Sequence, residues 1–419
     1  MNLRTATDER LSEGKLMRAI ALILSVVVLP PAARAADWRQ FRGNDSSGVS
    51  AETNLPTKLD DAEAIQWKAD LPGRGLSGPV VVGDRIFLTA SSGYRDDQLH
   101  VLCFSAATGE QLWDRQFKAT GRTICHESMC MATPQACSDG ERIYAYYSCN
   151  DVLCLDFDGN LIWYRGLGYD FPNASSSLGM SSSPVVADGA LVLQLDTESE
   201  SYATGLDALT GKTLWKLDRE KGAIYASPTL FHTPGSETPE VILQSNQSLL
   251  SVEPRTGKTR WEVEQSCGSV SSSTVAGDLL VAPLKELTVL RPTDATTTPE
   301  IVWSNSKLSP DTPTPVVYQD RVYVLKDSIL SCANLATGEP DWQMRLKCKQ
   351  AYASPLAGNG HLYLADENGV LQTIELGGEK GKVASRLELG EAIMCTPALA
   401  DGAFYVRSDK HLWKFVEPN

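Results

Sequence analysis

GLDALTGKTLW, residues 205–215, contains a Thr-Gly turn that is followed four residues later by tryptophan. The same Gly-x-x-x-Trp spacing occurs five times, at Gly109/Trp113, Gly159/Trp163, Gly211/Trp215, Gly257/Trp261 and Gly338/Trp342. Glycine adopts positive φ without Cβ strain, so Thr-Gly or Asp-Gly between two apolar runs predicts a tight hairpin. The tryptophan then lies on the returning strand. Recurrence at roughly 40 to 50 residues, or a multiple of it, is typical of a β-propeller.

Eight strand starts with similar sequences subdivide the chain. They are Gly78-Pro79, Thr133-Pro134, Ser183-Pro184, Ser227-Pro228, Ser273-Thr274, Thr314-Pro315, Ser354-Pro355 and Thr396-Pro397. Proline is tolerated at the first residue of a strand, where no ladder donor is needed. Trp303 stands at a repeat position without a Thr-Gly turn before it. We therefore predict an all-β fold, an eight-bladed β-propeller.

The ends of the chain predict how the ring closes. The C-terminal unit has three strands, and residues 65–68 supply a fourth strand with no three before it. Pairing the N-terminal strand with the C-terminal blade would hide both sheet edges. The predicted propeller spans residues 63–419, after a lead-in segment at 37–62.

Residues 1–36 have the features of a secretory signal peptide. An apolar run at 19–29 follows Lys15 and Arg18 and precedes small residues at 33–36, which fits a Sec-type cleavage site. No cysteine for a lipid anchor stands just after the run. We expect a periplasmic or secreted protein with no membrane span after cleavage, whether translation starts at Met1 or Met17.

The net charge is −14. An acidic surface repels phosphate backbones, so nucleic acid is not an expected partner. The charge is interpreted as a means of solubility, and the protein is expected to be a monomer.

Ten cysteines fall into groups by repeat position. Cys103, Cys154 and Cys332 precede their turn glycines where other units carry Gly or Ser, so they are interpreted as small core residues. Five others precede a first strand, in connections that meet at one mouth of the central channel, where propellers usually bind ligands. A disulfide joining Cys125 to Cys130 or Cys137 is expected there. The candidate ligand site comprises Arg74, Cys125, His126, Glu127, Tyr225, Cys267, Cys348, Tyr352 and Cys395.

Catalytic motifs are missing from the sequence. Residues 73–78 spell G-x-G-x-x-G, but a strand follows where a dinucleotide loop needs a helix. The five histidines are scattered, and no metal-ligand spacing occurs. No catalytic residue and no metal site are predicted.

Residues 205–215 closely match A-x-D-x-x-T-G-x-x-x-W, the pattern of pyrroloquinoline-quinone-type (PQQ-like) propeller repeats, and the chain resembles that family from about Trp67 to Phe415. The resemblance implies that the repeat tryptophans, Trp113, Trp163, Trp215, Trp261, Trp303 and Trp342, dock between neighbouring blades. Residues 38–43 look like the lead-in of secreted bacterial propellers of unassigned activity. The fold is also similar to that of the propeller scaffold lipoprotein of the outer-membrane β-barrel assembly machinery.

Three functions are consistent with this resemblance. We expect a non-enzymatic binding or scaffold module for a protein or cell-envelope partner, with no cofactor. The alternative is a PQQ-dependent quinoprotein dehydrogenase with calcium, although the vicinal Cys-Cys pair of such enzymes does not occur here. The second alternative is a redox or metal-binding funnel that uses the cysteines of the mouth.

Overall fold

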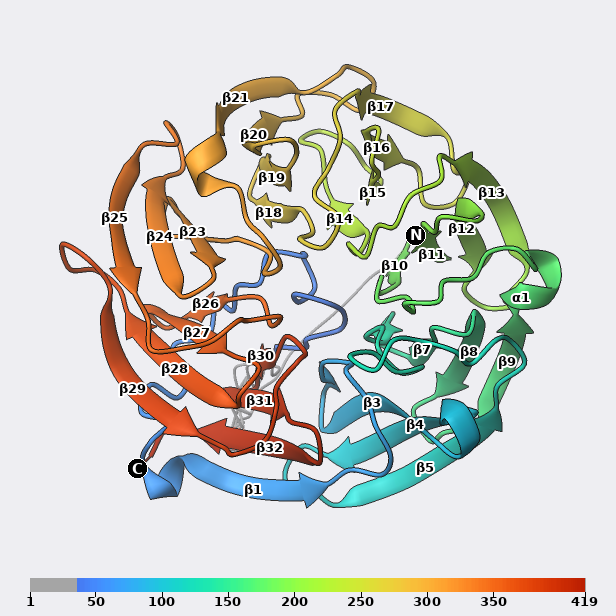
Figure 1. The fold of residues 1–419 in the computed structure, drawn as a ribbon, viewed down its shortest axis with the longest axis horizontal. Helices are drawn as coiled ribbons and strands as arrows, with labels where there is room; N and C mark the ends of the chain where they lie inside the picture. Colours follow the sequence, from blue (N-terminus) through green and yellow to red (C-terminus); the bar gives the residue numbers. More distant parts are fainter. Residues whose placement is uncertain (1–35, 419) are drawn as a thin grey trace, which may run out of the picture. The chain divides into compact units, whose positions relative to one another are not determined.

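A computed structural model describes residues 36–418, which form eight four-stranded antiparallel sheets arranged in a ring (Figure 1). The predicted all-β, eight-bladed propeller is confirmed. The predicted signal peptide lies outside the described residues, apart from its last position.

Blades 1 to 4 follow the chain from the inner strand to the outer one. Blade 1 contains β2 (Val80–Val82), β3 (Arg85–Ser92), β4 (Gln98–Ser105) and β5 (Gln111–Lys118); blade 2 contains β6 (Cys137–Ser138), β7 (Arg142–Tyr146), β8 (Asp151–Asp156) and β9 (Leu161–Gly166). Blade 3 contains β10 (Val185–Ala187), β11 (Ala190–Leu195), β12 (Ser201–Asp207) and β13 (Thr213–Arg219); blade 4 contains β14 (Thr229–Phe231), β15 (Glu240–Gln244), β16 (Leu249–Val252) and β17 (Thr259–Val263).

Blades 5 to 7 repeat this order. Blade 5 contains β18 (Thr274–Ala276), β19 (Leu279–Pro283), β20 (Leu287–Arg291) and β21 (Glu300–Asn305). Blade 6 contains β22 (Val316–Tyr318), β23 (Arg321–Lys326), β24 (Ile329–Asn334) and β25 (Pro340–Arg345). Blade 7 contains β26 (Leu356–Gly358), β27 (His361–Ala365), β28 (Val370–Glu375) and β29 (Lys382–Glu388). Short helices lie before the first strand at η1 (Ala62–Ala64) and between strands at η2 (Tyr94–Asp96), α1 (Leu167–Asp170) and η3 (Ser306–Leu308). None of the helices within residues 36–418 has the length and apolar character of a membrane-spanning segment.

Blade 8 combines the two ends of the described chain. It contains β30 (Ala398–Ala400), β31 (Ala403–Arg407) and β32 (His411–Val416), and its outer strand is β1 (Ile65–Asp70). Lys68 pairs with Trp413 across this seam, and its Nζ lies 4.4 Å from the tryptophan ring centroid. Because β1 pairs with β32, the C-terminal strand is not left as an exposed edge where the ring closes.

The repeat tryptophans connect successive blades. An indole N–H donates to a backbone carbonyl in the turn of the next blade at Trp67 (Ala106, 3.2 Å), Trp113 (Phe157, 3.0 Å), Trp163 (Ala208, 2.9 Å), Trp215 (Pro254, 2.8 Å) and Trp303 (Leu335, 2.7 Å). The turn glycines Gly109, Gly159, Gly211, Gly257 and Gly338 lie against these rings. Each of these tryptophans therefore packs against the turn glycine of the following blade.

Two tryptophans make different contacts because the next blade lacks the Thr-Gly turn. Trp261 donates to the Glu240 carboxylate (3.1 Å), which is fully buried and paired with Arg260 at 3.3 Å. Trp342 packs beside Gly381 instead.

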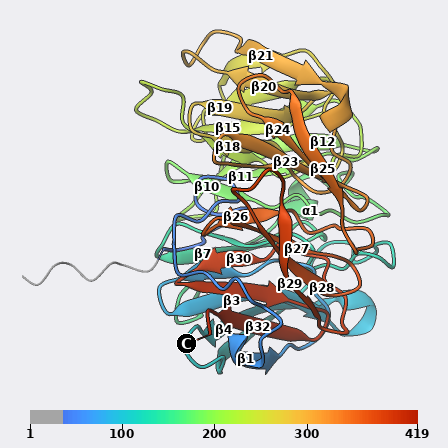
Figure 2. The same ribbon diagram turned by 90° about the vertical axis from the view of Figure 1, so that its left-hand side faces the viewer.

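The lead-in segment crosses the end of the channel opposite the predicted mouth. Figure 1 shows it in blue across the middle of the ring, and in Figure 2 its loops lie along one face. It forms backbone hydrogen bonds with blade 1 (Trp38 with Val81), blade 2 (Arg39 with Ser138) and blade 7 (Ser50 with Ala357).

Arg42 fixes this segment on the channel axis. Its side chain is fully buried and donates to the carbonyls of Pro355 (3.1 Å) and Pro315 (2.7 Å) and to Thr274 Oγ1 (3.1 Å). One guanidinium therefore links the inner strands of blades 5, 6 and 7, and the channel is closed at this end.

Candidate functional site

A cavity of about 250 Å³ occupies the channel between the mouth and the lead-in segment. Phe41, next to Arg42, is among its lining residues, and Tyr225, Val270 and Tyr352 line it from the connections at the mouth. Met129 and Met394 also border it. The cavity therefore has one closed end and largely apolar walls.

A ring of hydroxyls surrounds this cavity, one from each of six consecutive blades. Each oxygen accepts a backbone N–H from the preceding blade, at distances of 2.9 to 3.0 Å; the six are Ser183, Ser227, Ser272, Thr314, Ser354 and Thr396. These residues stand at the strand starts that precede the inner strands. Their sequence similarity is therefore explained by a circumferential set of hydrogen bonds.

The six hydroxyl protons have no acceptor among the residues that the structure describes. Each of these oxygens acts only as an acceptor among the hydrogen bonds of residues 36–418, and all six residues line the cavity. A serine or threonine hydroxyl can donate one hydrogen bond while it accepts others. The cavity wall thus offers up to six O–H donors to a ligand or to water.

The ring is interrupted at blades 1 and 2, which contribute no hydroxyl to it. Gly78 carries no hydroxyl, and a Cβ there would overlap the carbonyl oxygen of Thr396. Arg407 lies nearby, fully buried, and its Nη1 donates to Ser77 Oγ (2.8 Å) and the Thr89 carbonyl (2.7 Å). Its Nε and Nη2 have no partner among the described residues. Buried donors of this kind are rare in native proteins and call for an explanation.

The predicted site residues fall into two groups in the structure. Tyr225, Tyr352 and Cys395 line the cavity. Arg74 lies on the rim and holds the connection after β5, donating to the carbonyls of Met129 (2.9 Å) and Glu127 (2.6 Å). The side chains of His126 and Glu127 are exposed on that connection.

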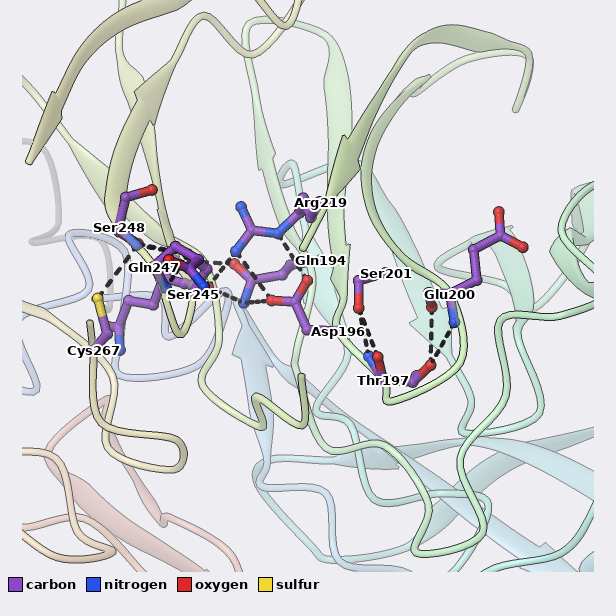
Figure 3. A network of polar contacts seen from close by, with 11 residues as sticks. Gln194, Asp196, Thr197, Glu200, Ser201, Arg219, Ser245, Gln247, Ser248 and Cys267 are labelled. Atoms are coloured by element: carbon purple, nitrogen blue, oxygen red, sulfur yellow. Dashed lines mark hydrogen bonds and ion pairs between the residues drawn. The ribbon is translucent and has the colours of Figure 1, made fainter. Parts of the chain in front are cut away.

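The predicted cysteines do not converge on the cavity. Cys267 belongs to a polar network below the mouth, where its Sγ donates to the Ser248 carbonyl (3.5 Å), near the Asp196–Arg219 ion pair (2.8 Å) (Figure 3). Cys348 packs in the core between blades 6 and 7, and Cys125 donates to the Met129 carbonyl.

Burial keeps these thiols protonated. It raises the pKa of Cys267 to about 12 and the pKa values of Cys348 and Cys395 to about 11. The thiolate is the nucleophile and the metal ligand, so these cysteines are poorly suited to either task.

The expected disulfide is corrected by the structure. All ten cysteines are free thiols. Cys125 packs against the core between blades 1 and 2, which also contains Cys130, but no bond joins the two. Cys137 is buried in the core between blades 2 and 3, so the sheet of blade 2 separates it from Cys125.

A metal centre is not evident at the mouth. Residues 36–418 contain no group of three or more His, Cys, Asp or Glu side chains that could hold a metal ion. The cavity lining carries no Asp or Glu, whereas calcium binds six to eight oxygens that usually include carboxylates.

The sequence model of the PQQ_2 family, described as outer membrane protein assembly factor BamB, matches residues 43–125, 99–343 and 285–384. The chain belongs to this family. The structure of BamB from Moraxella catarrhalis is similar to it with a TM-score of 0.62 at 16% identity, over 84% of this chain and 97% of that one. Quinohemoprotein alcohol dehydrogenase from Comamonas testosteroni has a TM-score of 0.68 at 14% identity, over 92% and 81%.

A curated relative is polyvinylalcohol dehydrogenase of a Pseudomonas species, 27% identical over 167 residues. The match covers 36% of this chain and 24% of the relative, so this chain spans about a quarter of that protein.

These comparisons correct two expectations. The expectation of a non-enzymatic scaffold is contradicted by the curated relative, which is a dehydrogenase. The expectation of no cofactor is contradicted by the dehydrogenases among the relatives and structural neighbours, one of them a quinohemoprotein. The Gly-x-x-x-Trp repeat reports only how blades pack, so it could not distinguish an enzyme from a scaffold.

Proposed function

We propose that the protein is an alcohol-oxidising dehydrogenase and that the cavity at the channel mouth binds its quinone cofactor. The observation that carries this proposal is the ring of six hydroxyls whose protons have no acceptor in the described part of the chain, in a cavity with apolar walls and one closed end. The similarity to polyvinylalcohol dehydrogenase supports the same class of reaction.

The cavity residues fit the organic part of a pyrroloquinoline quinone. A flat aromatic ring system needs apolar contacts, which Tyr225, Val270 and Tyr352 supply. Its quinone and carboxylate oxygens need donors, which the hydroxyl ring supplies. Arg407 does not itself line the cavity, and its buried guanidinium would act on the carboxylates only through its positive charge.

A calcium or lanthanide ion does not fit the same cavity. Its lining has hydroxyls and thioethers but no carboxylate, and hard cations bind weakly to such ligands. The proposal therefore concerns the quinone alone, and no step is assigned to a metal.

A bound quinone would supply the oxidant, because its reduction to a quinol takes up the two electrons and two protons that an alcohol loses when it becomes a carbonyl compound. The protein would contribute binding, orientation and exclusion of water. Hydroxyls of the ring would hold the oxygens of the cofactor. Phe41 and Arg42 close the far end, so the alcohol would enter from the mouth alone. The predicted signal peptide would place this activity in the periplasm or outside the cell.

Reconstitution with pyrroloquinoline quinone tests the proposal. The purified protein is dialysed against the quinone, with and without calcium, and its absorption and dye-linked oxidation of poly(vinyl alcohol) and small alcohols are measured. We expect about one quinone per chain and alcohol-dependent dye reduction, with little effect of calcium. Failure to retain the quinone would contradict the proposal.

A cavity-blocking variant and a matched control locate the site. Val270 lines the cavity and its side chain is 38% exposed, so Val270→Trp fills the mouth without disturbing a core. Val383→Trp makes the same change at a 39% exposed position on the outer strand β29. We expect Val270→Trp to weaken quinone binding at least about tenfold, a loss of about 1.4 kcal/mol. Equal affinities in the two variants would place binding elsewhere.

A further inference from the structure

Blade 1 holds a serine, a histidine and an aspartate in one hydrogen-bonded chain. Ser92 Oγ lies 2.7 Å from His100 Nε2, and His100 Nδ1 lies 3.0 Å from Asp114 Oδ2. When Asp114 accepts the Nδ1–H, Nε2 is left as the acceptor for the Ser92 hydroxyl. This is the order of contacts that activates a serine nucleophile, with a base oriented by a third group.

Three neighbouring strands supply these residues. Ser92 ends β3, His100 lies on β4 and Asp114 lies on β5. In the antiparallel register His100 is opposite Ala90 and Gln116, two residues from Ser92 and from Asp114, so their side chains share one face of the sheet. The sequence shows no motif for these three residues, because only the strand register of blade 1 brings their side chains together.

The imidazole is the most buried of the three groups. The side chain of His100 is 5% exposed and that of Asp114 is 16% exposed, while Ser92 is partly exposed. Gln116 Nε2 donates to Asp114 Oδ2 at 2.7 Å and helps to fix the carboxylate. The base is therefore shielded and held in place, while the serine lies at the partly exposed end of the chain of contacts.

The backbone that follows Ser92 has an unusual conformation. Gly93, Arg95 and Asp96 all have positive φ, of 81°, 55° and 61°. Such backbone at non-glycine residues is strained and concentrates at functional sites. The N–H of Gly93 has no acceptor within residues 36–418, so the residue after the serine offers a free donor for a developing oxyanion.

We propose that Ser92, His100 and Asp114 form a second active site that hydrolyses carboxylic esters. This activity is separate from the proposed alcohol oxidation and does not depend on it. Ser92 and His100 are the catalytic residues in this proposal, and Asp114 is a positioning residue that acts through His100.

The reaction has two acyl-transfer steps. Ser92 Oγ bonds to the ester carbonyl carbon while its proton passes to His100 Nε2; the bond to the leaving alkoxy group then breaks, and that group takes the proton and departs as an alcohol. Water next bonds to the acyl carbon and gives a proton to Nε2. The acyl–Oγ bond breaks, Ser92 recovers the proton, and a carboxylic acid is released. Nothing is oxidised, and solvent water is the only co-reactant.

The space around Ser92 limits the acyl group. Gly73 crosses over the end of β3, and a Cβ there would lie 3.1 Å from Ser92 Cβ and overlap the carbonyl of Ser91. The crossing backbone leaves little room on this side of Ser92, which favours a short acyl chain. Tyr94, two residues after Ser92, is 76% exposed and offers an aromatic surface to the alcohol part of the ester. We infer that the substrates are acetate-like esters of aromatic or apolar alcohols.

A fluorophosphonate probe and p-nitrophenyl acetate test this proposal in the full chain. Probe labelling forms a bond from phosphorus to Ser92 Oγ and releases fluoride, and peptide mass spectrometry identifies the labelled serine. We expect one label per chain at Ser92, and release of p-nitrophenol that Ser92→Ala lowers by about 10³-fold or more. Labelling at other residues only, or equal turnover in Ser92→Ala, would overturn the proposal.

Two further variants separate catalysis from folding. Ser91→Ala removes a neighbouring hydroxyl that bonds the Arg74 carbonyl and not a histidine, so it should keep labelling and turnover. Asp114→Asn should lower kcat on the order of 10³-fold or more with KM unchanged, at an unchanged melting temperature. If Ser91→Ala loses as much activity as Ser92→Ala, or if Asp114→Asn leaves kcat unchanged, the assignment of the triad is wrong.

Discussion

At the scale of single residues, the contact between a tryptophan and the next blade's turn glycine joins the ring. At Gly257 φ is 69°, and a Cβ would lie 2.5 Å from the Trp215 ring. Gly277 has nearly the same backbone, with φ of 63°, and nothing lies within 4 Å of the corresponding Cβ. Comparison of the two positions therefore separates the cost of backbone strain from the cost of disrupting the tryptophan–glycine contact.

Gly257→Ala is therefore expected to destabilise the protein more than Gly277→Ala. Positive φ costs an alanine about 1 to 2 kcal/mol at either position. Overlap with Trp215 adds on the order of 1 to 3 kcal/mol at Gly257 alone. Denaturant midpoints of the two variants give the comparison, and equal midpoints would show that the ring contact contributes little.

At the scale of elements, β1 and blade 8 are held together by a charged cluster as well as by their ladder. His411 Nδ1 lies 2.6 Å from Glu391 Oε1, and its Nε2 lies 3.1 Å from Asp70 Oδ1 on β1. Burial acts to raise the pKa of Glu391, but hydrogen bonds from His411 and Ser408 outweigh it and hold that pKa below its ordinary value.

A carboxylate with a depressed folded-state pKa gives stability that is complete above its unfolded pKa, about 4.3, and disappears as the pH falls through the folded value. We expect Glu391→Gln to reduce the loss of melting temperature between about pH 5 and pH 3. Glu388→Gln, on the exposed ion pair with Arg386, should leave that loss unchanged. Identical acid profiles for both variants would exclude Glu391 as the cause.

Local sequence patterns were enough to predict the fold, whereas the candidate site depends on contacts between residues that lie far apart in the sequence. The Thr-Gly turn and Trp215 lie within eleven residues, so their spacing alone predicts a hairpin. The hydroxyl ring was visible only as repeated strand starts, because each hydrogen bond joins residues of different blades. The cysteines preceded the correct strands, yet sequence position could not show whether Cys267 or Cys395 faces the cavity.

At the scale of the whole molecule, the lead-in segment makes the channel a closed-ended cavity. Arg42 connects three blades through its guanidinium, and removal of a buried donor leaves its acceptors unsatisfied. Arg42→Met should therefore cost on the order of 3 kcal/mol. Arg39→Met, whose side chain is 36% exposed and pairs with Asp37, is the control. Equal melting temperatures would show that Arg42 does not hold the ring.

The central claim is that a quinone bound in the channel mouth oxidises an alcohol. Its most direct test is a single turnover without dye or oxygen, in which the reconstituted protein is mixed with alcohol and the absorption of the bound quinone is followed. The account predicts that the quinone band is lost in proportion to the alcohol oxidised, up to one equivalent per chain, and that Val270→Trp, which should bind the quinone more weakly, shows a correspondingly smaller band. A quinone band that stays unchanged in the presence of poly(vinyl alcohol) and of small alcohols would contradict it.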